Sequence, residues 1–576
     1  MAKILYDITH RKDLKIVARN NWGLLVGLVI FWSIMIGMLI YSFTLNHGHI
    51  IYSLDDAYIH MAIAKNFSQH GIWGVTNNEF SSSSSSILYT LLLSLIFLFG
   101  PNEIAPLIIN LIFANLLIFE VYYILKEKIN LPPYATFSCL ILMIIFIPLP
   151  FLIFTGMEHV IQIFLNILFV YLVSTILSNP DIQDRKPFSS NEKGILLSKQ
   201  DRLLFIVTPL ITMVRFEGMF LIIAVSGLFF LRKKYFYSVL IAGLGFLPII
   251  IYGLISMSFG WFFFPNSVIL KGNSLDFTTI EGILVFLNPK IVVKSYYILI
   301  LLFGATTLII IQYYKNKKIW NSISIFSLIF IFVALLHLLF IGAYIENQNL
   351  SRYDGYLTAL GIMLFFISLK DYIPNHLSIN YIRIFISNIG GNSKINLIKL
   401  FAILFIVISF FFLFIPRTIY LLRRTPQASN NIYEQQYQMG LFLKKYYEGE
   451  CVALNDIGAA NYEADIECLD LRGLGSQEIA KSIINEELDE EVVYKAAKKR
   501  DCKIAIIYED KDYGYDIPSQ WLKVGEWKLE YNVVCGDDTV SFWAVDPDEV
   551  EDLIKNLQDF SKHLPRTVIE SGNYTE

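Results

Sequence analysis

The chain has 576 residues and a formal net charge of -4; 55% of its residues are hydrophobic and only 17% are charged. Soluble proteins carry charge on about a quarter of their residues. The composition therefore excludes a soluble globular protein and predicts a polytopic α-helical membrane protein, and the small net charge gives no indication of a nucleic-acid partner.

A basic N-terminal segment is followed by an apolar run over residues 22–45. This run is longer than the apolar region of a signal peptide, and no small-residue cleavage site follows it. We therefore expect an uncleaved first membrane span with a cytoplasmic N-terminus.

A helix needs about 20 apolar residues to cross a bilayer. The segments that meet or approach this length are 22–45, 103–125, 133–153, 158–178, 235–259, 291–313, 319–345, 354–370 and 396–415. Two weaker segments, 203–214 and 218–231, flank a polar interruption, and 87–99 is short enough to lie in the interface or to re-enter. Together these segments predict about 11 spans.

The basic clusters between the segments test this threading. If 87–99 does not cross, every basic cluster falls on the cytoplasmic side, as the positive-inside rule requires. The same threading places the C-terminus outside. It also places five unusual polar groups on the outer side, at 55–56, 155–158, 215–217, 264–271 and 347–354.

The composition changes near Pro416. Short β-type runs at 451–455, 466–471, 503–508 and 540–545 alternate with charged helical stretches at 433–448, 476–487 and 491–499. Alternation of strands and helices is typical of an α/β domain with a largely parallel sheet. We therefore expect a transmembrane domain over 1–415, a linker over 416–429 and an extracytoplasmic α/β domain over 430–576.

Four of the five cysteines lie in this external domain: Cys451, Cys468, Cys502 and Cys535. On an oxidising outer face they could form two disulfides with three connectivities, or remain free buried thiols. Their spacing fits no zinc pattern. Cys139 lies in an apolar span, where a small buried residue is the simplest interpretation.

The outer loop 46–86 carries two adjacent carboxylates, Asp55 and Asp56. Apolar residues recur at four-residue steps after them, up to Gly71, which predicts an amphipathic helix lying on the outer membrane surface. An aspartate at the start of a helix is commonly a cap. Two neighbouring carboxylates also raise each other's proton affinity, which suits a general base.

A serine run at 81–86 predicts a loop or a flexible linker, with Ser86 as the cap of the following helix. Glu158 stands at the outer start of a span, where a carboxylate is a cap or a ligand. Neither feature distinguishes structure from function by itself.

Arg215 and Glu217 lie between two half-length apolar segments, which indicates either a tight outer turn or an interrupted helix. Two interpretations fit this pair: a structural ion pair, or an arginine that faces an anionic group such as a phosphate. Asn266 and Lys271 lie in an outer loop whose aromatic residues also fit an interfacial belt. Arg352 at the mouth of a span also fits a snorkelling side chain.

The order of these motifs along nearly the whole chain resembles the GT-C class of membrane glycosyltransferases. The motifs are Asp55-Asp56-Ala57-Tyr58-Ile59, Thr155-Gly156-Met157-Glu158, Arg215-Phe216-Glu217-Gly218, Phe264-Pro265-Asn266-Ser267, Arg352-Tyr353, Asn455-Asp456-Ile457-Gly458-Ala459 and Asp470-Leu471-Arg472-Gly473-Leu474-Gly475. The series looks most like the polyprenyl-phosphate-sugar branch that includes the cell-wall arabinofuranosyltransferases.

The resemblance implies a transmembrane catalytic domain that transfers a sugar from a polyprenyl-phosphate donor at the outer face of a bacterial cytoplasmic membrane. The acceptor would be a hydroxyl of a glycan, a glycolipid or a protein. Asp55 would be the general base, and Asp56 would orient the acceptor or a bound divalent cation. The residues implied in binding the donor phosphate or the sugar are Arg215, Glu217, Glu158, Arg352, Lys271 and Asn266.

Two other classes of function remain open from the sequence. The interrupted region 203–231 also fits a transporter or flippase of a lipid-linked saccharide, because broken helices line transport sites. The external domain alone also fits a non-catalytic glycan-binding scaffold. Two carboxylates alone make a weak cation site, so the sequence leaves the need for a metal open.

Overall fold

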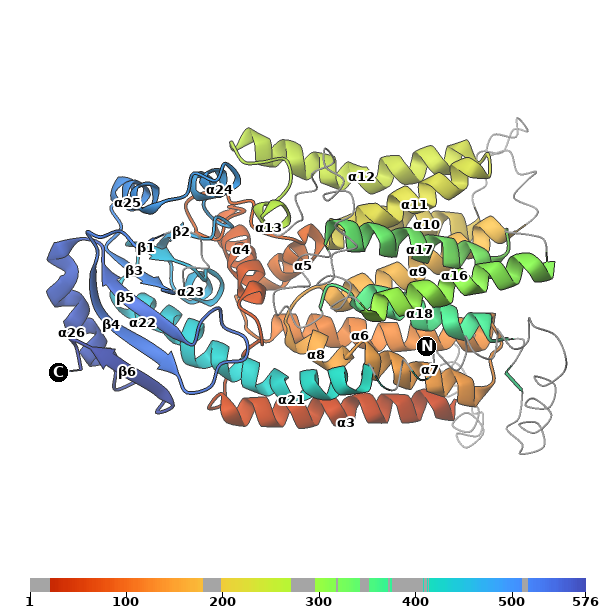
Figure 1. The fold of residues 1–576 in the computed structure, drawn as a ribbon, viewed down its shortest axis with the longest axis horizontal. Helices are drawn as coiled ribbons and strands as arrows, with labels where there is room; N and C mark the ends of the chain where they lie inside the picture. Colours follow the sequence, from red (N-terminus) through yellow and green to blue (C-terminus); the bar gives the residue numbers. More distant parts are fainter. Residues whose placement is uncertain are drawn as a thin grey trace.

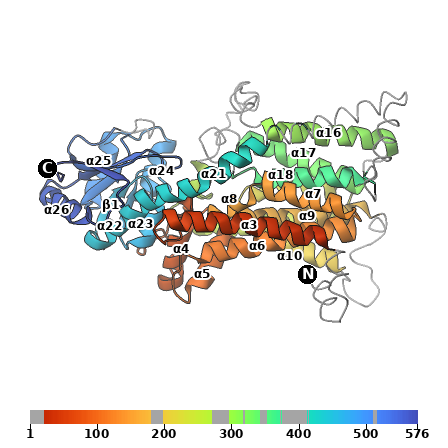
Figure 2. The ribbon, with the colours of Figure 1, turned by 90° about the horizontal axis from the view of Figure 1, so that it is seen from below.

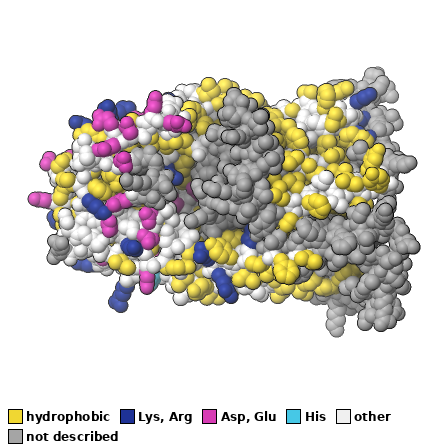
Figure 3. All heavy atoms as spheres, in the orientation of Figure 1, with side chains coloured by type: hydrophobic (Ala, Val, Ile, Leu, Met, Phe, Trp, Pro, Cys, Tyr) yellow, Lys and Arg dark blue, Asp and Glu magenta, His cyan; other side chains and the backbone are white. Residues whose placement is uncertain are grey.

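The computed structural model describes residues 21–179, 198–270, 296–316, 320–341, 352–370, 373–374, 408, 412, 414–509 and 516–575. Two parts follow one another along the longest axis, a helix bundle and a C-terminal α/β domain at one end of it (Figures 1 and 2). We refer to that end of the bundle as the domain end. Hydrophobic side chains cover much of the described bundle surface in Figure 3, whereas charged side chains gather on the α/β domain.

The bundle is built from α-helices. Its described helices are α3 (Trp22–Leu45), α6 (Ala105–Tyr123), α7 (Pro133–Phe146), α8 (Leu149–Phe154), α9 (His159–Ser178), α10 (Lys199–Val214), α11 (Gly218–Leu231), α12 (Tyr235–Ser258), α16 (Tyr296–Asn316), α17 (Ser322–Phe340) and α18 (Gly355–Ser368). The predicted span 133–153 is divided between α7 and α8, because Pro148 lies in the break between them and Pro150 occupies the first turn of α8.

Five of the described helices are long and apolar enough to cross a membrane: Trp22–Leu45, Ala105–Lys128, His159–Ser178, Tyr235–Ser258 and Ser322–Phe340. Others are apolar but shorter, and parts of the predicted spans 291–313 and 396–415 fall outside the described residues. The chain is therefore a multi-pass helical membrane protein, and the total of about 11 spans stays a prediction. The helix α9 is 78% buried against 33% for α3 and α12, so it lies at the centre of the bundle.

The interruption at Arg215–Glu217 is a tight turn between two antiparallel helices. Arg232, just after α11, donates to the carbonyl of Leu177 at 2.9 Å, and Gln200 at the start of α10 lines a cavity with Ser178. The start of α10 and the end of α11 therefore meet the same end of α9. The two segments therefore form a helical hairpin, and the alternative of one interrupted helix is wrong. The interrupted helix was the observation that favoured a transporter.

The two ends of the bundle differ in charge. Lys126 donates to the side chain of Asn21 at 2.7 Å, and Lys128 shares the cavity of Gln200 and Ser178, so these basic residues lie away from the domain end. The acidic pair and the turn at Arg215 lie at the domain end. This separation agrees with the expected threading, although the side of the membrane on which each end lies stays a prediction.

The helix α4 (Asp56–His70) follows the acidic pair and ends at Gly71, whose positive φ of 72° allows the chain to turn away. Nine of its residues are buried. It packs between α5 (Ile87–Phe97) and α23 (Gly458–Glu463) of the C-terminal domain. Protein therefore covers most of its apolar face, whereas its place on the membrane surface stays a prediction. With 11 residues, α5 is about 16 Å long and too short to cross a bilayer.

A continuous helical segment joins the two parts (Figure 1). It comprises α21 (Ile415–Ile432), the π-helical turn η7 (Tyr433–Tyr437) and α22 (Gln438–Tyr446). Residues 416–429, predicted as a linker, are therefore helical. Thr418 binds the carbonyl of Ile145 at 2.8 Å, so this helix is packed onto the bundle along its first turns.

The C-terminal domain contains a six-stranded sheet in the order β2-β1-β3-β5-β4-β6. Its strands are β1 (Cys451–Leu454), β2 (Glu467–Asp470), β3 (Ile504–Ile507), β4 (Leu522–Leu529), β5 (Thr539–Ala544) and β6 (Val568–Gly572). Its remaining described α-helices are α24 (Gln477–Ile484), α25 (Glu490–Lys499) and α26 (Val550–Phe560). The strands β2, β1 and β3 are parallel, and the other pairings are antiparallel. The four predicted strands are confirmed, but the largely parallel sheet is wrong because half of the sheet is antiparallel.

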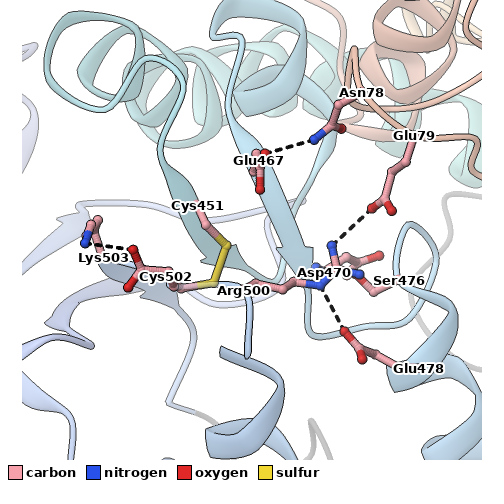
Figure 4. The surroundings of a disulfide bond; sticks show 11 residues. Asn78, Glu79, Cys451, Glu467, Asp470, Ser476, Glu478, Arg500, Cys502 and Lys503 are labelled. Atoms are coloured by element: carbon pink, nitrogen blue, oxygen red, sulfur yellow. Dashed lines mark hydrogen bonds and ion pairs between the residues drawn. A yellow bond between two sulfur atoms is a disulfide. The ribbon is translucent and has the colours of Figure 1, made fainter. Parts of the chain in front are cut away.

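One disulfide joins Cys451 at the start of β1 to Cys502 just before β3 (Figure 4). Cys468 and Cys535 are free and buried, as is Cys139 in α7. Of the predicted alternatives, the structure thus contains one disulfide and two buried thiols in this domain.

Candidate active site

The acidic pair lies where the bundle meets the C-terminal domain, and its two carboxylates face different partners. Asp55 precedes α4 but makes no side-chain cap bond to it. Its oxygens instead accept hydrogen bonds from the backbone N–H groups of Gly458 at 2.7 Å and Ala459 at 2.8 Å. Asp55 therefore binds the first turn of a helix about 400 residues away, which local sequence reasoning could not show.

Gly458 allows this close approach. A Cβ at this position would lie 2.1 Å from the backbone oxygen of Asp55 and 2.6 Å from its Oδ2. Any larger residue must displace Asp55, which explains the glycine in the motif Asn455–Ala459.

The site raises the proton affinity of Asp55. Burial and the charge of Asp456 raise its pKa from 3.8 to about 8, against the opposing effect of the two N–H donors. A carboxylate that accepts two hydrogen bonds keeps further lone pairs, so it can still accept a proton.

Asp56 points elsewhere and forms an ion pair with Arg352. The distance from Oδ2 of Asp56 to Nη2 of Arg352 is 2.5 Å. Arg352 is buried, donates to the hydroxyl of Tyr353 at 3.1 Å, and its Nη1 lies 3.4 Å from the sulfur of Met157. The guanidinium therefore links the first loop, the turn before α9 and the segment before α18.

Arg215 binds two carboxylates. Its Nε and Nη2 donate to the two oxygens of Glu217 at 3.0 and 2.7 Å, and its Nη1 donates to Glu158 at 2.6 Å. The other oxygen of Glu158 lies 3.6 Å from Nε2 of His60. Arg215 and Glu158 are both buried, so this is a structural ion pair at the site itself.

Tyr353 connects the two arginines. The guanidinium carbons of Arg215 and Arg352 each lie 5.0 Å from the centroid of its ring. The ring edge of His159 lies against the same tyrosine, with centroids 5.9 Å apart. The sequence alone predicts no role for Tyr353, His60 or His159; the available signal was that Tyr353 is adjacent to Arg352.

A cavity of about 540 Å³ opens beside these groups. Its polar end is formed by Asp56, His60, Arg215, Glu217 and Tyr353. Its remaining wall is largely apolar and is lined by Phe216, Met219, Phe220, Ile223, Phe264, Val268, Ile269, Leu336, Phe340 and Ile341, among others. Asp55 does not line this cavity but adjoins it through Asp56.

The serine run is packed against the site instead of forming a flexible linker. Ser83 and Ser85 line the cavity, and Ser85 donates to Glu158 at 3.4 Å. Ser86 caps α5 by accepting from the N–H of Tyr89, as predicted. The hydroxyl of Ser83 donates to the carbonyl of Leu474, so the C-terminal domain also touches the run.

The side chain of the predicted ligand Asn266 points away from this cluster. The side chain of Asn266 donates to the carbonyl of Gly473 at 2.7 Å and does not line the cavity, so it holds the loop after β2. That loop is closed by Asp470, which accepts from the N–H groups of Arg472 and Gly475. Lys271 lies outside the described residues.

Comparison with known proteins gives one family match and several similar structures. A family model described as a domain of unknown function (DUF8728) matches residues 430–543. No curated protein matches the chain.

The apo oligosaccharyltransferase of Archaeoglobus fulgidus aligns with a TM-score of 0.41 and 11% identity over 87% of this chain and 73% of that chain. The oligosaccharyltransferase AglB of the same organism, in complex with an inhibitory peptide and a dolichol-phosphate, gives 0.43 and 13% over 88% and 73%. These scores are too low to carry an argument about function.

The acidic pair does not fit a divalent cation in this arrangement. Both oxygens of Asp55 accept backbone N–H groups, and Asp56 binds Arg352. A cation needs several converging oxygen ligands. Within the described part of the chain, no group of three or more His, Cys, Asp or Glu side chains converges as a metal site.

Proposed function

We propose that the chain is a GT-C-type glycosyltransferase that transfers a sugar from a polyprenyl phosphate to an acceptor hydroxyl at the outer face of the membrane. One observation carries this proposal: the cavity combines a largely apolar lining with polar groups that include Arg215, beside Arg352 and Asp55. An apolar chain ending in a phosphate-linked sugar has the same division of chemistry.

The apolar wall suits a prenyl chain, and the arginines suit its phosphate. Guanidinium groups bind phosphate through two parallel hydrogen bonds. Arg215 and Arg352 are already paired with Glu158, Glu217 and Asp56. A bound phosphate would therefore compete with these carboxylates, and we propose Lys271 as a further cation for it.

Asp55 is the proposed general base. Its raised pKa of about 8 suits proton transfer near neutral pH, whereas Asp56 is neutralised by Arg352 and supports it. In the transfer, the acceptor O–H bond breaks and its proton passes to Asp55. The acceptor oxygen bonds to the anomeric carbon as the bond from that carbon to the phosphate oxygen breaks, and the polyprenyl phosphate leaves with its electron pair.

The motif order favours arabinofuranose as the sugar and a cell-envelope glycan, glycolipid or protein as the acceptor. The external domain, adjoining Asp55, supports a large acceptor outside the membrane. These finer assignments rest on the resemblance.

The test is a panel of radiolabelled polyprenyl-phosphate sugars, including arabinofuranose, offered with cell-envelope acceptors to the full-length protein in nanodiscs. We expect one donor to be consumed. We expect Asp55→Asn to lower the transfer rate by about 10²–10⁴-fold, the usual contribution of a general base. The control is Glu551→Gln, which changes an exposed carboxylate of α26. Consumption of no donor would overturn the function, and an unchanged rate for Asp55→Asn would overturn the base. If Asp55→Asn keeps its activity and the removal of residues 430–576 abolishes it, the result would favour the alternative of a glycan-binding scaffold.

A further inference from the structure

A carboxylate of the C-terminal domain, Asp456, lies close in the chain to the two N–H groups that bind Asp55. Asp456 lies on the loop after β1, two residues before Gly458. Its Oδ2 accepts hydrogen bonds from Nε2 of Gln436 at 2.7 Å and from the hydroxyl of Tyr508 at 2.5 Å. Because Asp456 is two residues from Gly458, whose N–H binds Asp55 at 2.7 Å, its charge acts on Asp55 and raises the proton affinity of that carboxylate.

A buried network fixes the position of Asp456. The hydroxyl of Tyr508 also lies 2.9 Å from Oε1 of Gln435, and the backbone N–H of Tyr508 donates to the side chain of Asn455 at 2.8 Å. The thiol of Cys535 donates to Oε1 of Gln436 at 3.3 Å. These side chains come from separate segments of the domain and are all buried. A network of this kind holds one geometry because each partner restrains the next.

The π-helical turn η7 supplies two members of this network. Gln435 and Gln436 are adjacent in the turn, and each is 1% exposed. Single π-helical turns are uncommon and occur frequently at functional sites. Here the turn lies in the helical segment that enters the C-terminal domain from the bundle, so the network is tied to both parts of the protein.

We propose that the C-terminal domain completes the catalytic centre, with Gly458 and Ala459 holding Asp55 in place and Asp456 acting as the positioning residue that strengthens it as a proton acceptor. This proposal rests on the proposed function for its catalytic consequence. The contact itself, two N–H groups on one carboxylate and a glycine that alone permits the approach, stands on the geometry.

Among the charges around Asp55, that of Asp456 has the largest effect on its proton affinity. The titratable groups whose charges interact with Asp55 are Asp456, Asp56 and the thiol of Cys535. Asp56 is paired with Arg352 and acts less strongly on Asp55 than Asp456 does, and burial raises the pKa of the Cys535 thiol, which stays uncharged. Asp456 therefore provides the main uncompensated negative charge, which favours the protonated state of Asp55 that forms during transfer.

The first test measures the contact without any substrate. In hydrogen exchange of the full-length protein in nanodiscs, we expect the amides of Gly458 and Ala459 to be protected in the wild type. Asp55→Ala should raise their exchange rates at least ~10-fold, the effect of losing a bonded acceptor worth about 1.4 kcal/mol. Equal rates in the two proteins would show that the contact is absent and would overturn the proposal, whether or not any sugar is transferred.

The second test measures the catalytic consequence with the donor consumed in the panel above. In Asp456→Asn, which keeps an oxygen for Gln436 and Tyr508, the acidic limb of the kcat/KM profile should move to lower pH by roughly one unit. The matched control, Asp548→Asn, changes an exposed carboxylate of the same domain and should keep the wild-type limb.

Gly458→Ala should lose most of the transfer rate while the bundle remains folded, because the new Cβ displaces Asp55. An unchanged limb in Asp456→Asn would overturn the positioning role, and faster transfer by Gly458→Ala would show that the contact is inhibitory. If no donor is consumed but the amides are protected, the proposed function fails. The positioning role then fails with it, and the contact is purely structural.

Discussion

Asp56 and Arg352 form an ion pair of 2.5 Å, although 296 residues separate them in the chain. The arginine is 3% exposed and the aspartate 25% exposed, so the pair is largely withdrawn from solvent. It joins the first turn of α4 to the segment before α18. The domain end of the bundle is therefore closed by a contact between an early and a late element of the membrane domain.

Replacing Arg352 tests this closure. Arg352→Gln leaves Asp56 largely buried without its cation, and we expect a loss of about 1–3 kcal/mol in the free energy of unfolding. Arg352→Lys keeps the charge but loses the planar contact with Tyr353, so its loss should be smaller. Thermal unfolding in detergent measures both, with the exposed Arg423→Gln as the control. A wild-type melting temperature for Arg352→Gln would contradict the prediction.

A double-mutant cycle tests the buried pair of Arg215 and Glu158. Arg215→Met leaves Glu158 buried and partly unpaired, and we expect a loss of about 3–5 kcal/mol. Glu158→Gln should cost less, because Glu217 still binds the arginine. The double variant should be more stable than the sum of the single losses predicts. Additive losses would show that the two side chains do not interact.

Gly156 sets the position of Glu158 and should not tolerate a side chain. Its φ is +68°, and a Cβ would lie 2.6 Å from the ring of Tyr52. Its carbonyl also accepts the hydroxyl of Tyr89 at 2.6 Å. We expect Gly156→Ala to lower the free energy of unfolding by more than about 1 kcal/mol, the cost of the left-handed conformation alone. Gly243→Ala in α12 is the matched control, since a Cβ there meets nothing within 4 Å, and an equal effect of both would refute the clash.

The disulfide predicts both the stability of the C-terminal domain and which cysteines react with an alkylating reagent. Cys451 and Cys502 are 51 residues apart, and closing a loop of this length stabilises a fold by about 4 kcal/mol in the chain-entropy model. Cys451→Ala should therefore lower the melting temperature of the domain by several degrees. Alkylation after denaturation without reductant should label Cys139, Cys468 and Cys535 only. Labelling of all five cysteines would show that the bond is absent.

Local patterns predicted much of this protein. The apolar lengths identified the helices of the bundle, and the basic clusters placed Glu158, Arg215 and Arg352 at the same end as the acidic pair. The structure brings these groups together around one cavity. Their assembly from distant segments was predictable because the topology alone confines them to one face.

The remainder depends on contacts that no local pattern encodes. The apolar stripe of α4 looks the same whether lipid or protein covers it, so α23 as its partner could not be predicted. The two N–H donors of Asp55 lie in another domain. The sequence did not predict β4 or β6, and β6 is short and polar. The direction of a strand depends on its pairing with distant segments, so the antiparallel half of the sheet could not be predicted.

The titration of Asp55 makes the stability of the protein depend on pH. Its pKa is about 8 in the folded protein and near 3.8 in the unfolded chain, so the folded state binds its proton more tightly. The stability from this group is complete below about pH 4 and is lost as pH rises to about 8, with a slope of at most ~1.4 kcal/mol per pH unit. Asp470, with a pKa raised by burial to about 6, changes stability in the same direction, so the comparison with a variant isolates Asp55. We expect Asp55→Asn to flatten the fall in melting temperature between pH 5 and 8 in detergent; equal slopes in the two proteins would show that Asp55 is not the group that titrates.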